Sequence, residues 1–486
     1  MNPKWLAFIL ALATGLLIMG ALLPGRYLFL LDSTFGPEPE LFNSYRPSVL
    51  MLHSLLWIAK QTAPWLYPKW FMLLSIVLAY YFAYILLSNR VTHKTALLFA
   101  FFYAANPFIY NRLISGQVFI PFSYALLPLV AYLSMKKFSW KNELVLALII
   151  ALGCLQIHFL AIMLLVYLAI SIFARKPITA ILTVVLISIA LNIPVLFESG
   201  EKLSEVSSLD LLVFRPEMNL RFSQLLMLTT LHGFWRQHAY MQLWQFTPVA
   251  WLLPFFWLIY LTAEGYLSKP KHRNPMLLLL LFGILMPIAM MIFGNFTLAL
   301  SNYFPFLLAF RDSQKLTALT ALGYLYLGAF GLEQLNKTKL KHVFWLLTLA
   351  FFLFIAWPML FGFQAQIKPA DYPSDYYTAK SIIDSDNDSF EVLFLPWHMY
   401  MDFKWLPNSD KRINTPIAKL LTKPVLTSTN PELTKAAAKP KINTSIKYII
   451  LAKEVDYRSY LYLLNQTELI LNTSNLYLLR NPNFKS

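Results

Sequence analysis

The apolar stretch WLAFILALATGLLIMGALL, Trp5–Leu23, is followed after six residues by LLDSTFGPEPELFNSYRP, residues 30–47. The first stretch has the roughly 20 apolar residues that a helix needs to cross a bilayer. Asp32 comes shortly after it, and Glu38 and Glu40 follow within the same loop. The sequence therefore predicts a membrane-spanning helix whose first loop places carboxylates at the lipid surface.

The composition agrees with a membrane protein. Hydrophobic residues make up 58% of the chain and charged residues 13%, and the mean hydropathy is +0.55. Soluble domains are about 45–50% apolar and about 25% charged. The net charge of +16 is explained by lysines on cytoplasmic loops and by contact with anionic lipid phosphate, so we expect no nucleic-acid partner.

Apolar runs predict an α-helical polytopic fold with about eleven transmembrane helices. These runs are Trp5–Leu23, Trp70–Leu87, Thr95–Ala105, Val118–Ser134, Glu143–Gly153, Leu155–Phe173, Ile178–Pro194, Pro248–Ala263, Pro275–Ile292, Leu316–Leu332 and Val343–Leu360. The third and fifth runs are short for simple crossings, and short helices are tolerated where they pack inside the protein.

Basic residues predict the orientation, because cytoplasmic loops carry an excess of Lys and Arg. With a cytoplasmic N-terminus, the short inside loops contain Arg90 and Lys94; Lys136, Lys137 and Lys141; Arg175 and Lys176; Lys269, Lys271 and Arg273; and Lys337, Lys339 and Lys341. Asp32, the segments 106–117, 197–247 and 310–316, and the chain from residue 361 onward then lie outside. We expect a multi-pass plasma-membrane protein.

The composition changes after the last apolar run. Residues 364–486 are more polar and contain the strand-like runs FEVLFLP, KYIILA and TELILN. Short strands of this kind favour a small α/β or α+β domain. We therefore predict a transmembrane domain over residues 1–360, with catalytic loops on its outer face, and an extracytoplasmic soluble domain over residues 361–486.

The first outer loop offers a candidate catalytic base. Asp32 can act as a general base near the membrane surface, or it can be a solvated loop carboxylate. Glu38 and Glu40 can orient it or hold a divalent cation, and carboxylates suit Mg²⁺ or Mn²⁺.

A second outer segment, NPFIYNRLISGQ, contains Asn106, Arg112 and Gln117, and we expect Asn106 and Gln117 to contact the substrate. Pro107 and Gly116 favour a re-entrant turn there. An unpaired arginine at a membrane boundary is costly, so Arg112 either snorkels or contacts phosphate or the Asp32 loop. His158, near the outer end of its helix, is either a satisfied core histidine or a substrate contact.

A third outer segment, FRDSQKL, precedes a late apolar run. Arg311 and Lys315 form a candidate phosphate site at a helix start, and Asp312 beside them can orient the substrate or hold a metal. A solvated helix start capped by Asp312 is the alternative. The long loop before it combines cations, acids and aromatic rings that suit a sugar, namely Arg215, Glu217, His232, Trp235 and Arg236.

Five segments of the chain carry a resemblance to a known family: LLDSTFGPE, NPFIYNRLISGQ, FRDSQKL, VLFLPW and KYIILAKE. In these segments the chain resembles membrane glycosyltransferases of the GT-C superfamily, in particular prokaryotic arabinofuranosyltransferase-like and lipoteichoic-acid-decorating enzymes. The resemblance implies that Asp32 matches an essential acidic residue of the first outer loop. It also implies a polyprenyl-phosphate sugar as donor and no nucleotide site.

We therefore expect an inverting transferase that passes a sugar from a polyprenyl-phosphate donor to a glycan, lipid or protein acceptor. Arg311, Lys315 and Arg112 would bind the donor phosphate. A transporter or flippase for a lipid-linked glycan is the alternative, and a non-catalytic assembly subunit is another. A transporter would favour internal repeats and polar residues at mid-membrane, whereas here the polar segments cluster at one surface.

Overall fold

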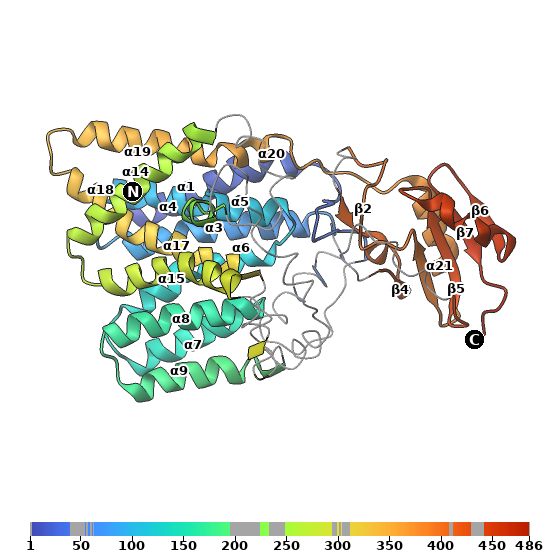
Figure 1. The fold of residues 1–486 in the computed structure, drawn as a ribbon, viewed down its shortest axis with the longest axis horizontal. Helices are drawn as coiled ribbons and strands as arrows, with labels where there is room; N and C mark the ends of the chain where they lie inside the picture. The colour runs from blue at the N-terminus through green and yellow to red at the C-terminus, as the bar shows by residue number, and fades with distance from the viewer. Residues whose placement is uncertain are drawn as a thin grey trace.

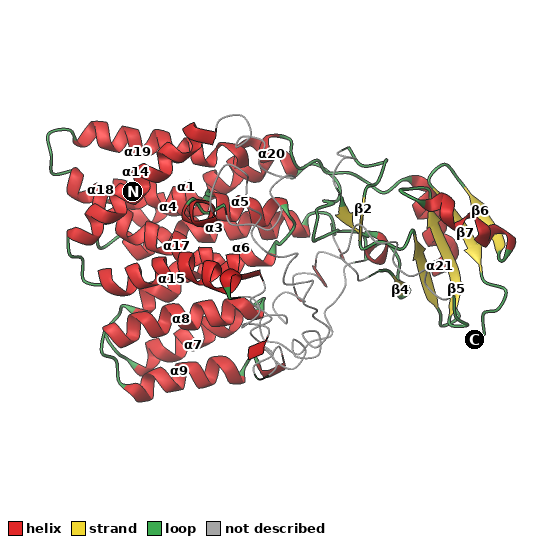
Figure 2. Ribbon diagram, viewed as in Figure 1, coloured by secondary structure: helices red, strands yellow, loops and turns green. Residues whose placement is uncertain are grey.

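The computed structural model describes residues 2–38, 54, 57–58, 61, 63–194, 224–232, 248–293, 299–300, 303, 312–407, 412–428 and 442–485. Its long axis runs from a bundle of helices, which holds the N-terminal end, to a smaller C-terminal region (Figure 1). All the named strands lie in that C-terminal region (Figure 2).

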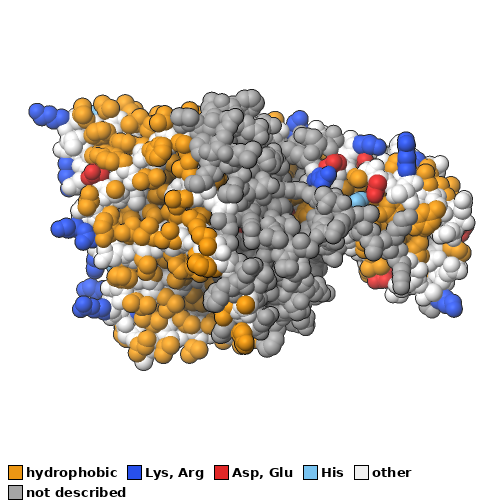
Figure 3. All heavy atoms as spheres, in the orientation of Figure 1, with side chains coloured by type: hydrophobic (Ala, Val, Ile, Leu, Met, Phe, Trp, Pro, Cys, Tyr) orange, Lys and Arg blue, Asp and Glu red, His pale blue; other side chains and the backbone are white. Residues whose placement is uncertain are grey.

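The first helix shows why the bundle suits a lipid environment. Helix α1, Pro3–Met19, begins with Pro3 at its first position, and the Asn2 side chain accepts a hydrogen bond from the Lys4 amide. Ala7 and Ala11 are fully buried on its inner side, while Trp5 and Leu12 are exposed on the outer side. A helix that is apolar all round is typical of a membrane span, and the bundle surface in Figure 3 is largely hydrophobic.

Six helices of the described chain are long and apolar enough to cross a membrane: Pro3–Leu22, Tyr67–Leu87, Ala250–Leu267, Arg273–Met290, Asp312–Leu335 and Lys341–Gln364. Shorter apolar helices are α6, Phe119–Ser134, α8, Ile157–Phe173, and α9, Ile178–Ala190. The third and fifth predicted runs are helices α4, His93–Ala104, and α7, Trp140–Gly153. The helical membrane character is supported, and the count of eleven crossings stays a prediction.

The remaining bounds are as follows: η1 Gly20–Leu22, α3 Tyr67–Leu87, α5 Pro107–Ile114, α12 Gln224–Thr229, α14 Pro248–Leu267, α15 Arg273–Ile292, α17 Thr317–Gly323, the π-helical turn η3 Tyr324–Gly328, α18 Ala329–Leu335, α19 Lys341–Ala356, η4 Trp357–Met359 and α20 Leu360–Gln364. Helix α3 lies inside the bundle and packs against α1, α4 and α6. Lysine and arginine side chains project from the end of the bundle that faces away from the C-terminal region (Figure 3).

The C-terminal region is built on a five-stranded mixed sheet in the order β4-β1-β5-β7-β6. Strand β1, Glu391–Leu395, pairs in parallel with β4, Val425–Leu426, and β5, Ile446–Ala452. Strand β7, Leu476–Arg480, is antiparallel to β5 and to β6, Glu468–Asn472. A separate ribbon pairs β2, Tyr400–Met401, with β3, Ile413–Asn414.

The 3₁₀ segments η5, Ile417–Lys419, and η6, Tyr457–Asn465, and helix α21, Ser374–Asp384, complete the C-terminal region. Asp375 of α21 accepts hydrogen bonds from Thr473 and Asn475 in the turn between β6 and β7. The helix is therefore fastened to the sheet by a carboxylate as well as by its apolar side.

The loop that leaves α1 joins the bundle to the C-terminal region. Tyr27 forms an antiparallel bridge with Ala370, and the Asn414 amide donates to the Leu31 carbonyl at 2.9 Å. The Glu38 amide donates to the Lys419 carbonyl at 2.9 Å, a close approach at which a β-carbon on Gly36 would lie 2.2 Å from the same oxygen. The C-terminal region thus packs directly against the segment that carries Asp32.

Candidate functional site

Asp32 is held in place by hydrogen bonds from three directions. Its backbone amide donates to the Ser115 carbonyl at 2.8 Å. Its Oδ2 accepts from Gln117 Nε2 at 2.7 Å, and its Oδ1 accepts from the Tyr400 hydroxyl at 3.2 Å. Asp32 as a residue is partly exposed, and its carboxylate is fixed in position by these contacts.

Helix α5 positions Gln117 because its sequence specifies both of its ends. Asn106 is the N-cap, its Oδ1 accepting from the Phe108 amide at 3.0 Å, and Pro107 takes the first helical position. At the other end Gly116 has a positive φ of 87°, and the Gln117 amide donates to the Arg112 carbonyl at 2.8 Å. This is the Schellman pattern, which favours glycine. The segment expected to be a re-entrant turn therefore contains an eight-residue helix.

Gly116 also lets the Asp32 loop approach. A β-carbon there would lie 2.8 Å from Leu30 Cβ and 2.9 Å from the Ser33 amide nitrogen. The two segments therefore contact each other through their backbones, which brings the Asp32 amide to the Ser115 carbonyl.

Behind Gln117 lies a buried cluster of charges. Arg112, fully buried, donates through Nη1 to Gln117 Oε1 at 2.6 Å and to Asp312 Oδ2 at 3.2 Å. Lys315 Nζ lies 3.3 Å from the same Asp312 oxygen and 3.4 Å from His158 Nε2. Asp312 and Lys315 belong to a 3₁₀ turn, residues 312–316, that leads into α17. The contacts form one chain from Asp32 through Gln117, Arg112, Asp312 and Lys315 to His158.

The surroundings of Asp32 set its basicity. Although the residue is partly exposed, protein atoms surround its carboxyl group closely. This loss of hydration raises the pKa of the carboxyl above the ordinary value of 3.8, and the hydrogen bonds from Gln117 and Tyr400 act in the opposite direction. The net direction is upward. A carboxylate with a raised pKa is a stronger proton acceptor at neutral pH than an ordinary aspartate.

The divalent cation that the sequence led us to consider stays a prediction, because Glu40 lies outside the described residues. Among them no group of three or more His, Cys, Asp or Glu side chains could hold a metal ion. Glu38, expected to assist Asp32, instead pairs with Lys380 of α21 at 3.3 Å, because the loop is drawn towards the C-terminal region. Asp312 Oδ2 faces two cationic side chains.

Two other predicted substrate contacts have structural partners instead. Asn106 is fully buried, and besides capping α5 it donates through Nδ2 to the Tyr103 carbonyl and the Tyr124 hydroxyl. His232 is buried, with Thr230 on its Nδ1 and the Trp251 indole donating to its Nε2 at 2.7 Å. These contacts hold the bundle together, and the expected substrate role of both side chains stays a prediction. The remaining candidates, Glu40, Arg215, Glu217, Trp235, Arg236 and Arg311, lie outside the described residues.

Sequence reasoning missed Tyr400 and Lys69. Tyr400 follows strand β1 after a short connection. The sequence signal that could have identified it is its place in an aromatic segment just after a predicted strand. Lys69, buried at the start of α3, donates to the carbonyls of Leu23 and Gly25. It therefore anchors the beginning of the loop that carries Asp32.

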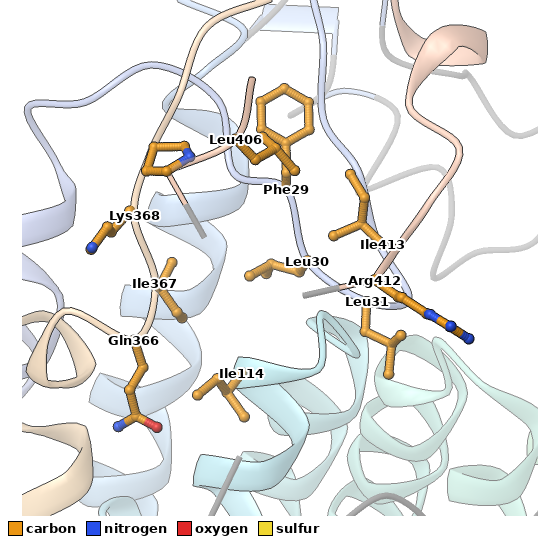
Figure 4. A pocket seen from close by; sticks show the side chains of 11 residues that line it. Phe29, Leu30, Leu31, Ile114, Gln366, Ile367, Lys368, Leu406, Arg412 and Ile413 are labelled. Atoms are coloured by element: carbon orange, nitrogen blue, oxygen red, sulfur yellow. The ribbon is translucent and has the colours of Figure 1, made fainter. Parts of the chain in front are cut away.

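A narrow cavity of about 30 Å³ lies beside Asp32 at the junction of the two regions. Figure 4 shows Leu30, Ile114 and Ile367 around its centre, while the charged ends of Lys368 and Arg412 point away from it. The cavity belongs to the packing of the junction.

Comparison with known proteins shows which solved structures have a similar fold. The sequence matches no protein-family model and no curated protein. Among solved structures the chain is similar to arabinofuranosyltransferase AftD from mycobacteria, with a TM-score of 0.59 at 13% sequence identity, covering 94% of this chain and 35% of that one. A structure of a mutant of the same enzyme gives a TM-score of 0.61 at 13% identity, covering 100% of this chain and 42% of that one. The chain thus spans well under half the length of the enzyme whose fold it shares.

Proposed function

We propose that the protein is a GT-C-type membrane glycosyltransferase, with Asp32 as general base, a polyprenyl-phosphate sugar as donor and an extracytoplasmic glycan, lipid or protein as acceptor. One observation carries the proposal above all: Asp32 is partly exposed, with both carboxylate oxygens hydrogen-bonded, next to a cluster of buried cations. The likeness to an arabinofuranosyltransferase supports the class of reaction.

The proposed reaction is a single displacement with inversion. The acceptor hydroxyl oxygen forms a bond to the anomeric carbon as the bond from that carbon to the donor phosphate oxygen breaks. Asp32 takes the hydroxyl proton, and the lipid phosphate leaves with the electron pair. A positioned base of this kind contributes about 10²–10⁴-fold to the rate.

The leaving phosphate gains charge in the transition state, so nearby cations would stabilise that state more than the bound donor. Arg112 and Lys315 are the described candidates, and Asp312 lies within 3.3 Å of both. This carboxylate offsets part of their charge. We therefore propose that Arg311, the residue before Asp312, contributes a further positive charge towards the phosphate.

The test is the substitution Asp32→Asn, assayed with purified protein and a panel of labelled polyprenyl-phosphate sugars. The amide keeps the size of the side chain but cannot accept the proton, so turnover should fall by about 10²–10⁴-fold while donor binding is largely kept. The matched control is Asp371→Asn, which removes a carboxylate paired with Arg26 on the protein surface and should leave turnover near that of the wild type.

Full transferase activity in a folded Asp32→Asn protein would reject the role of Asp32. If the wild-type protein transfers no sugar from any donor but accelerates the movement of lipid-linked glycans across vesicle membranes, the transporter alternative would be favoured instead.

A further inference from the structure

A large groove lies in the bundle between helices α1, α3, α4 and α19. Its volume is about 1060 Å³. Its walls are mostly apolar and include Leu10, Leu97, Phe101, Leu349 and Leu353. Pockets that take drug-sized ligands have volumes of about 300–1,000 Å³, so the groove has room for a substantial apolar molecule. It shares no lining residue with the site around Asp32.

The length of the groove matches one leaflet of a membrane. Its lining residues on α19 run from Lys341 to Leu353, which at the helical rise corresponds to about 18 Å. The hydrocarbon core of a bilayer is about 30 Å thick, so one leaflet contributes about 15 Å. A molecule that fills the groove from its mouth would therefore extend about as far as one lipid leaflet.

The mouth of the groove is cationic. Lys94 and Lys341, both exposed, contribute to its lining together with His93 and His342. Helices α4 and α19 also begin there, and helix N-termini favour negative charge. The lining contains no Asp or Glu. One carboxylate is near, since Glu333 accepts hydrogen bonds from the backbone amide and the hydroxyl of Thr92. The two lysines and this one carboxylate together leave the mouth with a net positive charge.

We propose that this groove binds an anionic phospholipid. Its phosphate lies between Lys94 and Lys341, and its acyl chains lie along the apolar walls. A depth of one leaflet together with a cationic mouth fits this class of ligand. A neutral lipid would leave the mouth without a counter-charge, and a water-soluble anion would leave the apolar walls uncovered. The site does not depend on the proposed transferase function.

The experiment compares lipid binding by native mass spectrometry of the purified protein in neutral detergent. Phosphatidylglycerol and phosphatidylcholine with identical acyl chains are titrated separately. The groove variant is Lys94→Gln with Lys341→Gln, and the matched control is Lys137→Gln with Lys141→Gln, two exposed lysines that do not line the groove. Because all four side chains are exposed, these substitutions should not disturb folding.

The wild-type protein and the control should bind phosphatidylglycerol more tightly than phosphatidylcholine. The groove variant should bind phosphatidylglycerol about 25-fold more weakly, the product of about fivefold for each lysine at a membrane surface. Equal phosphatidylglycerol affinity in the groove variant and the wild type would overturn the proposal, as would equal affinity of the wild type for the two lipids.

A second variant tests the walls without changing any charge. Leu349→Trp adds bulk to a half-buried wall position and should reduce the retention of phosphatidylglycerol. Unchanged retention in this variant would place the lipid outside the groove and overturn the proposal.

Discussion

The two oxygens of Asp32 take hydrogen bonds from parts of the chain that lie far apart in sequence. Gln117 comes from the end of α5 in the bundle, and Tyr400 comes from the ribbon β2–β3 in the C-terminal region. The orientation of the Gln117 amide is fixed as well, because its other end accepts from Arg112. Both donors stabilise the ionised carboxylate and so oppose the effect of burial on its pKa.

The substitution Tyr400→Phe should change the pH dependence of the reaction. The base must be deprotonated, so activity falls as the pH drops through the raised pKa of Asp32. Removing the Tyr400 hydroxyl removes a hydrogen bond that lowers this pKa. The acid limb of the profile of kcat/KM against pH should therefore move to higher pH.

The control for Tyr400→Phe is Tyr377→Phe, which removes a hydroxyl that donates to Asp371. Its pH profile should match that of the wild type. If the acid limb of Tyr400→Phe stays at the wild-type position, Tyr400 does not set the basicity of Asp32.

At the level of single residues, the sequence led us to expect that Asp32, Arg112, Gln117, Asp312, Lys315 and His158 lie on one face, and the structure joins these side chains in one chain of contacts. The sequence did not predict the role of Tyr400, because a hydrogen bond between residues 368 positions apart leaves no local sequence pattern. The structural partners of Asn106 and His232 were not predicted for a related reason: the sequence does not show that one is a buried helix cap and the other a buried histidine held by Thr230 and Trp251.

Among the elements, α5 has the greatest influence on the site. Its C-terminal turn presents Gln117, and its last carbonyls meet the Asp32 loop. The turn depends on a glycine with a positive φ whose missing side chain leaves room for the loop.

Gly116→Ala should therefore reduce activity more than stability. The left-handed conformation costs a non-glycine residue roughly 1–2 kcal/mol, and the added methyl group would push the loop at Leu30 and Ser33 away. We expect turnover to fall at least about tenfold, because displacing a catalytic group by about 1 Å can cost about 100-fold.

The control for this substitution is Gly20→Ala, since nothing lies within 4 Å of a β-carbon at Gly20 and its φ is −55°. Turnover and the midpoint of thermal unfolding are measured for both variants. Wild-type turnover in Gly116→Ala would show that the loop accommodates the methyl group and that the turn does not position Asp32.

Elements with a clear local sequence pattern were predicted, and elements that depend on distant partners were not. The runs FEVLFLP, KYIILA and TELILN correctly predicted β1, β5 and β6. Strand β7 was missed, although it lies between β5 and β6, because five residues of LYLLR resemble any short apolar run and its pairing is set at a distance. Helix α5 was expected as a turn because Pro107 and Gly116 are only nine residues apart, although they mark the two ends of a short helix.

For the whole molecule, the bundle and the C-terminal region are joined at the Asp32 loop. The pair Glu38–Lys380 and the hydrogen bonds of Leu31 and Glu38 to the C-terminal region surround this junction. Within the bundle, the basic side chains seen in Figure 3 gather at the end opposite to this junction, and others lie on the C-terminal region. This separation agrees with the predicted orientation, in which the basic loops face the cytoplasm.

The orientation can be tested by labelling cysteines in a Cys154→Ala background, since Cys154 is buried and is the single cysteine of the chain. A cysteine introduced by Arg458→Cys, exposed in the C-terminal region, should react with a membrane-impermeant reagent in intact cells. A cysteine introduced by Lys137→Cys, exposed at the predicted cytoplasmic side, should react only after permeabilisation. The reverse pattern would invert the topology and place Asp32 inside the cell.

The separation of 368 residues between Asp32 and Tyr400 also has a consequence for biosynthesis. A ribosome adds about 5–20 residues per second, so the Asp32 loop emerges roughly 20–70 s before the residue that completes its hydrogen bonding. Until then the growing chain holds a carboxylate without one of its two donors. The assembled centre therefore exists only after synthesis has passed Tyr400 and the ribbon β2–β3 has folded, which couples the completion of this site to the synthesis of the C-terminal region.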